Sequence, residues 1–61
     1  MKREELLKRL REAGCELARQ GGRHDWWVQP KTGVQQAVPR HREINEQLAR
    51  HIVKMLGGSG R

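Results

Sequence analysis

The sequence lacks the features that are typical of disulfide-bonded, membrane-spanning or secreted proteins. It contains one cysteine, Cys15, so neither a disulfide within the chain nor a cysteine-based metal site can form. No apolar stretch approaches the roughly 20 residues that are needed to span a bilayer. Acidic residues occur within residues 1–5 (MKREE), where a signal peptide would need its apolar segment. We therefore predict a cytoplasmic protein without membrane association, in which Cys15 packs as a small buried hydrophobe.

Residue patterns for common cofactors are missing as well. The three histidines have no carboxylate cluster beside them, so no metal-ligand spacing results. The glycines form no nucleotide-binding loop with the required Lys-Ser/Thr pair, and no Ser or Cys occurs in the setting of a nucleophile. With 61 residues, the chain has no room for a second domain or a deep cavity. An active site would have to lie on the surface of one small domain, without a metal ion or other cofactor.

Negative charge is also scarce, and the excess of positive charge is the strongest property of the composition. Thirteen Lys and Arg residues against seven Asp and Glu residues give a net charge of +6 and a sequence pI near 10.8. So much positive charge on so short a chain favours a polyanionic partner, of which nucleic acid is the foremost example.

Two helices are predicted from apolar residues that recur at three- and four-residue spacing. The stripe of the first helix, over residues 3–13, consists of Leu6, Leu7, Leu10 and Ala13. The second helix is capped by Asn45 and ends at Gly57-Gly58. Its stripe consists of Leu48, Ile52, Met55 and Leu56. Because neither helix is long enough to be stable alone in water, both stripes should pack on a common surface.

That surface is a predicted sheet of three strands, over residues 15–20, 25–29 and 34–38. Gly21-Gly22 and the segment 30–33 (PKTG) separate the strands, and in both breaks glycine is expected to supply a positive φ. Short turns between consecutive strands give an antiparallel meander. The predicted fold class is α+β in the order α-β-β-β-α, with both helices on one face of the sheet. Residues 1–57 form the single domain, and residues 58–61 are expected to be a mobile tail.

Most of the side chains that could carry chemistry lie in residues 21–27 (GGRHDWW). Backbone amides near Gly22, together with Arg23, could hold a phosphate group, and His24 could transfer a proton beside it. Trp26 is the candidate RNA contact, whose indole could stack on a base, and since Trp26 and Trp27 point to opposite faces of a strand, Trp27 then belongs to the core. From the pattern alone, a hairpin turn followed by a solvated surface histidine is the favoured interpretation, with catalysis by His24 as the alternative.

A second basic cluster connects the third strand to the second helix. Arg40 and Arg42 are candidate phosphate contacts, with an ordinary solvated basic loop as the alternative. His41 is a candidate RNA contact and could be a second acid or base, but the pattern favours a surface role over acid or base catalysis. Lys31, in the segment 30–33, is a further candidate RNA contact, whereas His51 is expected to be solvated within the second helix.

Several short motifs, in order and spacing, make the chain resemble HicA toxins over residues 2–57. They are Glu5-Leu6-Leu7, Ala13-Gly14, Arg19-Gln20-Gly21-Gly22, His24, Pro30-Lys31-Thr32-Gly33, Val38-Pro39-Arg40-His41, and the closing set Leu48, Arg50, Ile52 and Leu56. The resemblance implies a fold like that of a double-stranded-RNA-binding domain. It also implies an mRNA interferase that a HicB antitoxin binds and silences.

In this family the histidine of a Gly-x-His motif is catalytic, and His24 occupies that position. The chain departs from the family pattern at Arg23, where a small residue such as Ser often precedes the histidine. The resemblance therefore leads us to expect a toxin that cleaves mRNA without a metal ion, with His24 as general acid or base. A non-catalytic basic RNA-binding module of the same fold is the main alternative, and a basic face that docks an acidic protein is a third.

Overall fold

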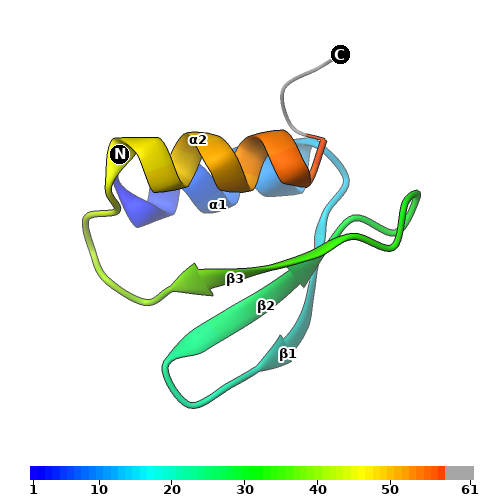
Figure 1. The fold of residues 1–61 in the computed structure, drawn as a ribbon, viewed down its shortest axis with the longest axis horizontal. Helices are drawn as coiled ribbons and strands as arrows, with labels where there is room; N and C mark the ends of the chain where they lie inside the picture. The colour runs from blue at the N-terminus through cyan, green and yellow to red at the C-terminus, as the bar shows by residue number, and fades with distance from the viewer. Residues whose placement is uncertain (58–61) are drawn as a thin grey trace.

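The computed structural model describes residues 1–57 and has the predicted order of one helix, three strands and a second helix (Figure 1). The predicted tail, residues 58–61, lies outside the described residues. Each boundary of the strands differs from the predicted one by at most one residue. The elements are α1 (Arg3–Glu12), β1 (Glu16–Gln20), β2 (His24–Val28), β3 (Gln35–Pro39) and α2 (Glu46–Met55).

The strands form one antiparallel sheet in the order β1-β2-β3, and α1 and α2 lie on the same side of it (Figure 1). This arrangement confirms the predicted fold class, while the likeness to a double-stranded-RNA-binding domain stays a prediction. Every residue of β1 is exposed, so the helices bury β2 and β3 but leave β1 uncovered. The opposite face of the sheet carries no element in the described part of the chain.

Turn and cap residues account for several of the boundaries. Gly14 follows α1 with φ +89°, and Gly33 closes the turn before β3 with φ +79°, both in the left-handed region that favours glycine. The side chain of Asn45 caps α2 as predicted, because its Oδ1 accepts hydrogen bonds from the backbone N–H of Gln47 (2.8 Å) and of Leu48 (3.2 Å).

The core lies between the helices and the sheet. Its largest fully buried side chains are Leu6, Leu10, Val38, Ile52 and Leu56. Trp27 and Cys15 are also buried, in agreement with the sequence analysis. Neither helix among residues 1–57 combines the length and apolar character that crossing a membrane requires.

The predicted apolar stripe of α2 was wrong in two of its four members. Leu48 and Met55 are 40% and 41% exposed, whereas Ala49 and Val53 are buried in their place. The buried face of α2 has to meet α1 as well as β3, and this requirement rotates it toward Ala49, whose small side chain permits close approach. The prediction selects the larger side chains, Leu48 and Met55, which lie at the edge of the contact between α2 and the rest of the core.

The buried amide of Gln29 joins the C-terminal ends of both helices. Its Nε2 donates to the carbonyl oxygens of Ala13 (3.1 Å) and Leu56 (3.0 Å), and its Oε1 accepts from the N–H of Lys31 (3.3 Å). Helix ends leave carbonyl groups without partners inside the helix, and burial of such groups requires other donors. The side chain of Gln29, directly after β2, thus donates hydrogen bonds to carbonyl groups at the C-terminal ends of both α1 and α2.

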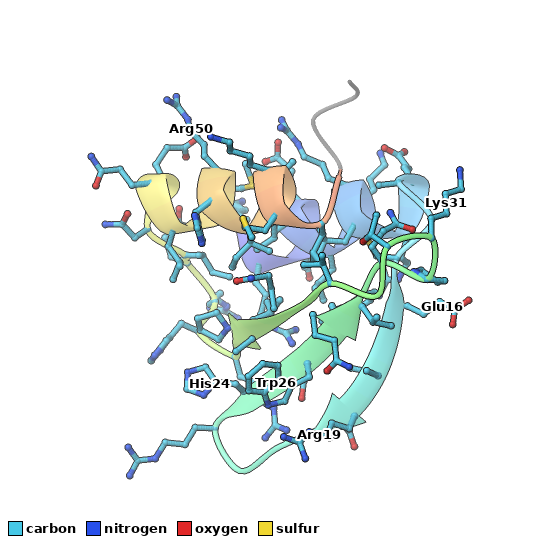
Figure 2. All side chains as sticks on the ribbon, turned by 45° about the vertical axis from the view of Figure 1, so that its right-hand side comes forward. Glu16, Arg19, His24, Trp26, Lys31 and Arg50 are labelled. Carbon is cyan, nitrogen blue, oxygen red and sulfur yellow. The ribbon has the colours of Figure 1, made fainter. Side chains whose placement is uncertain are left out.

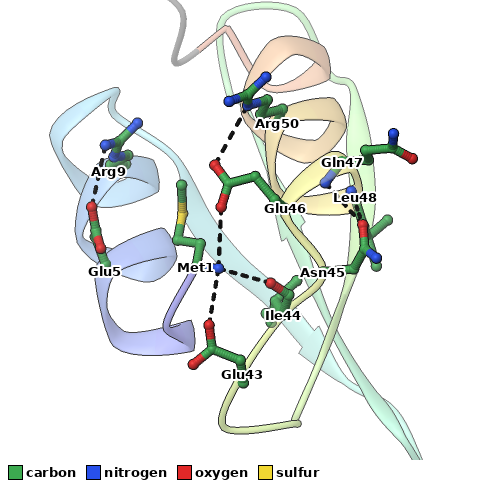
Figure 3. A network of polar contacts seen from close by, with 10 residues as sticks. All are labelled: Met1, Glu5, Arg9, Glu43, Ile44, Asn45, Glu46, Gln47, Leu48 and Arg50. Atoms are coloured by element: carbon green, nitrogen blue, oxygen red, sulfur yellow. Dashed lines mark hydrogen bonds and ion pairs between the residues drawn. The ribbon is translucent and has the colours of Figure 1, made fainter.

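At the opposite ends of the helices, the amino group of Met1 lies among acidic groups (Figure 3). It is 3.1 Å from Glu43 Oε2, 3.2 Å from Glu46 Oε1 and 2.9 Å from the carbonyl oxygen of Ile44. The hydrogen bond to Glu43 contributes most to raising the pKa of this amino group. These contacts attach the start of the chain to the segment that leads into α2.

Candidate functional site

Strand β2 separates its side chains onto two different faces. His24, Trp26 and Val28 point to the open face of the sheet, whereas Asp25 and Trp27 point toward the helices. His24 is exposed, while Asp25 and Trp27 are only 8% and 6% exposed. The imidazole is therefore in solvent, and the indole of Trp27 is the one that belongs to the core.

On the open face, the half-buried Trp26 packs against the guanidinium group of Arg19 from β1 (Figure 2). The guanidinium carbon is 5.5 Å from the centre of the indole, within the range of a cation–π contact. Arg19 reaches this position because the pairing of β1 with β2 shifts between Leu17 and Arg19, which leaves Ala18 as an extra residue. Nothing in the residue pattern marks this bulge, so the contact of Arg19 with Trp26 could not be predicted from the sequence.

The turn before His24 is tight at Gly21. The N–H of Gly21 donates to the carbonyl oxygen of His24 (2.8 Å), and a Cβ at Gly21 would lie only 2.9 Å from that oxygen. Neither Gly21 nor Gly22 has a positive φ, so the prediction that they supply one was wrong. Glycine is needed at position 21 because there is no space for a side chain, and position 22 has open space around it.

Asp25 is held by two arginines on the side of β2 away from His24. Its Oδ2 accepts from Arg3 Nη2 (2.8 Å), and its Oδ1 accepts from Arg40 Nε (2.9 Å) and Nη2 (2.7 Å). The hydrogen bond from Arg40, followed by the charges of Arg40 and Arg3, lowers the pKa of this carboxyl group. Although Asp25 is next to His24 in the sequence, its carboxylate faces the other way and is already paired.

The predicted RNA contacts do not all lie together. Gly22, Arg23, Arg40 and His41 line one surface depression, beside the start of β2 where His24 lies. Arg42 lines a neighbouring depression with Lys2 and Arg3. Lys31 is exposed at the far end of β2, and the strand, about 13 Å long, separates it from His24 (Figure 2).

Arg40 lines the depression beside the start of β2 but already makes four hydrogen bonds within the protein. It makes two hydrogen bonds to Asp25, and it also donates to the carbonyl oxygens of Gly21 (2.6 Å) and Gly22 (3.3 Å). Arg40 is exposed, as are Arg23, His41 and Arg42. The position of Arg40 at this end of the sheet was predicted from the sequence, whereas its hydrogen-bond partners were not.

A family model described as the HicA toxin of bacterial toxin-antitoxin systems matches residues 3–57. The chain belongs to the HicA toxin family. The matched region includes all five elements and every residue of the candidate site. This HicA chain is therefore the toxin component of a toxin–antitoxin system, and its family implies an antitoxin as its partner. No curated protein and no solved structure gives a significant match.

Proposed function

We propose that this HicA toxin is an endoribonuclease that cleaves mRNA, with His24 as its general acid or base. The observation that carries the proposal is the exposure of His24 on the open sheet face, on the same face as Trp26 and next to Arg23. An imidazole changes its charge near neutral pH, so it can both accept and donate protons there. A catalytic group on an uncovered face is accessible to a long polymer substrate.

The proposed reaction uses the RNA's own 2′-hydroxyl as nucleophile. Neutral His24 takes the proton of that hydroxyl as the 2′-oxygen forms a bond to the adjacent phosphorus, and the bond from phosphorus to the 5′-oxygen breaks. Alternatively His24, as imidazolium, donates the proton that the departing 5′-oxygen requires. Either way the products carry a 2′,3′-cyclic phosphate and a 5′-hydroxyl. A positioned acid or base of this kind contributes about 10²- to 10⁴-fold to the rate.

The RNA is proposed to lie along the basic end of the sheet. Gly22, Arg23 and His41 would contact the phosphate near the scissile bond, in the depression that they line. Trp26 would stack on an unpaired base, and Arg42 and Lys31 would contact phosphates farther along the strand. We further propose that the antitoxin that binds this toxin is of the HicB type, and that the toxin acts in the cytoplasm.

The deciding experiment compares His24→Ala with His51→Ala on a labelled RNA in the presence of EDTA. His51 is an exposed histidine on α2, so its variant controls for removal of an imidazole. We expect cleavage by the unmodified protein and by His51→Ala, with cyclic phosphate ends, and none by His24→Ala. Full activity of His24→Ala would remove the catalytic assignment, and inhibition by EDTA would contradict a reaction without metal.

One observation favours the alternative of a non-catalytic RNA-binding module. Within residues 1–57 the imidazole of His24 makes no hydrogen bond, so no neighbouring side chain orients it as in many catalytic sites. This alternative predicts salt-dependent RNA binding that His24→Ala leaves unchanged, with intact RNA even at high protein concentration. The cleavage assay above therefore separates the two functions.

A further inference from the structure

Residues on both sides of His24 are held by a single guanidinium group, that of Arg40, through backbone carbonyl groups before it and a side-chain carboxylate after it. On the N-terminal side, Arg40 Nη2 donates to the carbonyl oxygen of Gly21 (2.6 Å) and Nη1 to that of Gly22 (3.3 Å). On the C-terminal side, Nε and Nη2 donate to Oδ1 of Asp25 at 2.9 and 2.7 Å. His24 therefore lies between two anchored points of the chain.

The anchor itself is attached to the rest of the fold through Arg3. Arg3 donates from Nη2 to the other carboxylate oxygen of Asp25 (2.8 Å) and from Nε to the carbonyl oxygen of Pro39 (2.9 Å). Pro39 is the residue of β3 that pairs with His24. The carboxylate of Asp25 is 11% exposed, and two guanidinium groups neutralise its charge. Charge-assisted hydrogen bonds of this kind are stronger than neutral ones.

We propose that Arg40 is a positioning residue, which fixes the location of His24 by clamping Gly21, Gly22 and Asp25. The inference rests on the proposed function, in which His24 transfers a proton on bound RNA. Because the imidazole has no hydrogen bond of its own within the described residues, its position depends on the backbone that carries it. Misplacement of a reacting group by about 1 Å can lower a rate by about 10²-fold.

A direct contact of Arg40 with phosphate is the competing role. A guanidinium has five N–H groups, and Arg40 makes four hydrogen bonds within the protein. One N–H remains free within the described residues, so a phosphate could accept from it, but a phosphate held by two of the N–H groups would have to displace a contact that holds the turn. The two roles differ in what they require: a phosphate contact needs positive charge, whereas the clamp needs the planar, multiply donating shape that lysine lacks.

The test uses Arg40→Lys and Arg40→Gln, and it compares them with Arg42→Lys and Arg42→Gln, which alter a proposed phosphate contact and are expected to change KM and not kcat. Arg42 is an exposed arginine two residues away with no carboxylate partner in the described part of the chain. We expect both Arg40 variants to lower kcat by about 10- to 100-fold while KM changes by less than about threefold. If instead Arg40→Lys keeps kcat and Arg40→Gln raises KM, Arg40 contacts phosphate and the clamp is overturned.

Amide hydrogen exchange gives a second readout that needs no catalysis. The N–H of Gly21 donates to the carbonyl oxygen of His24, so its exchange reports on the turn that Arg40 holds. We expect faster exchange of Gly21 in both Arg40 variants, at temperatures where circular dichroism shows them folded, and unchanged exchange in the Arg42 variants. Unchanged exchange in the Arg40 variants overturns the clamp. If the unmodified protein cleaves no RNA, the proposed function fails, and with it any positioning of His24 for cleavage.

Discussion

Arg19 and Trp26 face each other across the β1–β2 pair, with the guanidinium carbon 5.5 Å from the centre of the indole. The contact exists because β1 contains the extra residue Ala18, which puts Arg19 opposite Trp26. Without the bulge, Ala18 would occupy that place and Arg19 would face the other side of the sheet. An arginine and an indole on an uncovered sheet face together provide positive charge and a flat apolar surface, which suit a nucleotide.

We expect Trp26→Ala to weaken binding of single-stranded RNA, because stacking of one base on an aromatic ring contributes about 1–3 kcal/mol. The measurement is the Kd of a fluorescent oligonucleotide, made in a His24→Ala background so that no RNA is cleaved. Val28→Ala is the control, since Val28 is on the same face of the same strand. Equal Kd values for Trp26→Ala and Val28→Ala would exclude Trp26 as a stacking surface.

The two glycines of the β1–β2 turn should respond very differently to alanine. A Cβ at Gly21 would lie 2.9 Å from the carbonyl oxygen of His24, a backbone atom, so the strand itself must shift. We expect Gly21→Ala to lower the free energy of unfolding by about 1–3 kcal/mol and to reduce cleavage. Gly22→Ala meets no atom within 4 Å and should change stability by less than about 0.5 kcal/mol. Urea unfolding of both variants measures this, and similar losses would contradict the close approach at Gly21.

Stability in acid should depend on Asp25. Its pKa is lowered in the folded protein, chiefly by the hydrogen bond from Arg40, so the folded state binds this proton less readily than the unfolded state. The stabilisation is therefore fully present above the unfolded pKa of about 3.9 and is lost as pH falls through the lower folded value. Unfolding temperatures measured between pH 2 and 7 test whether the stability of the fold decreases as the pH is lowered.

Asp25→Asn is the control for that pH dependence. It should unfold at a lower temperature than the unmodified protein at pH 7, and the difference should shrink in acid. Some dependence will persist, because the amino group of Met1 also lowers the pKa of Glu46. A constant difference between the two proteins from pH 2 to 7 would show that Asp25 has an ordinary pKa.

Replacement of Gln29 should destabilise the whole fold and not the site alone. Gln29→Met keeps a similar volume but removes the donor that reaches the carbonyl oxygens of Ala13 and Leu56. Leaving a buried polar group without a partner costs about 1–3 kcal/mol. Chemical denaturation of Gln29→Met should show this loss, with Gln35→Met as control because Gln35 is exposed on β3. Equal stability of the two variants would mean that water replaces the lost contacts.

Much of the fold can be predicted from residue patterns that involve only neighbouring positions in the sequence. The stripe of Leu6, Leu7 and Leu10 in α1, the cap at Asn45 and the positive φ of Gly14 and Gly33 depend on residues close together in the chain. Alternation along β2 likewise decides that Trp26 and Trp27 have opposite environments. The family resemblance, which the match to residues 3–57 bears out, also rests on short motifs in order.

What the sequence determined by itself was therefore the order of the elements, the family and a surface position for His24 close to the turn before the second strand. The tertiary structure alone decided which face of α2 is buried, that Ala18 is an extra residue opposite Trp26, and that Arg40 holds Asp25 and the carbonyl oxygens of Gly21 and Gly22. The physical reason is the separation along the sequence between the residues that interact. Periodicity and turn residues act over a few positions, whereas Arg40 meets partners 15 to 19 residues away, and such pairings exist only once the sheet has formed.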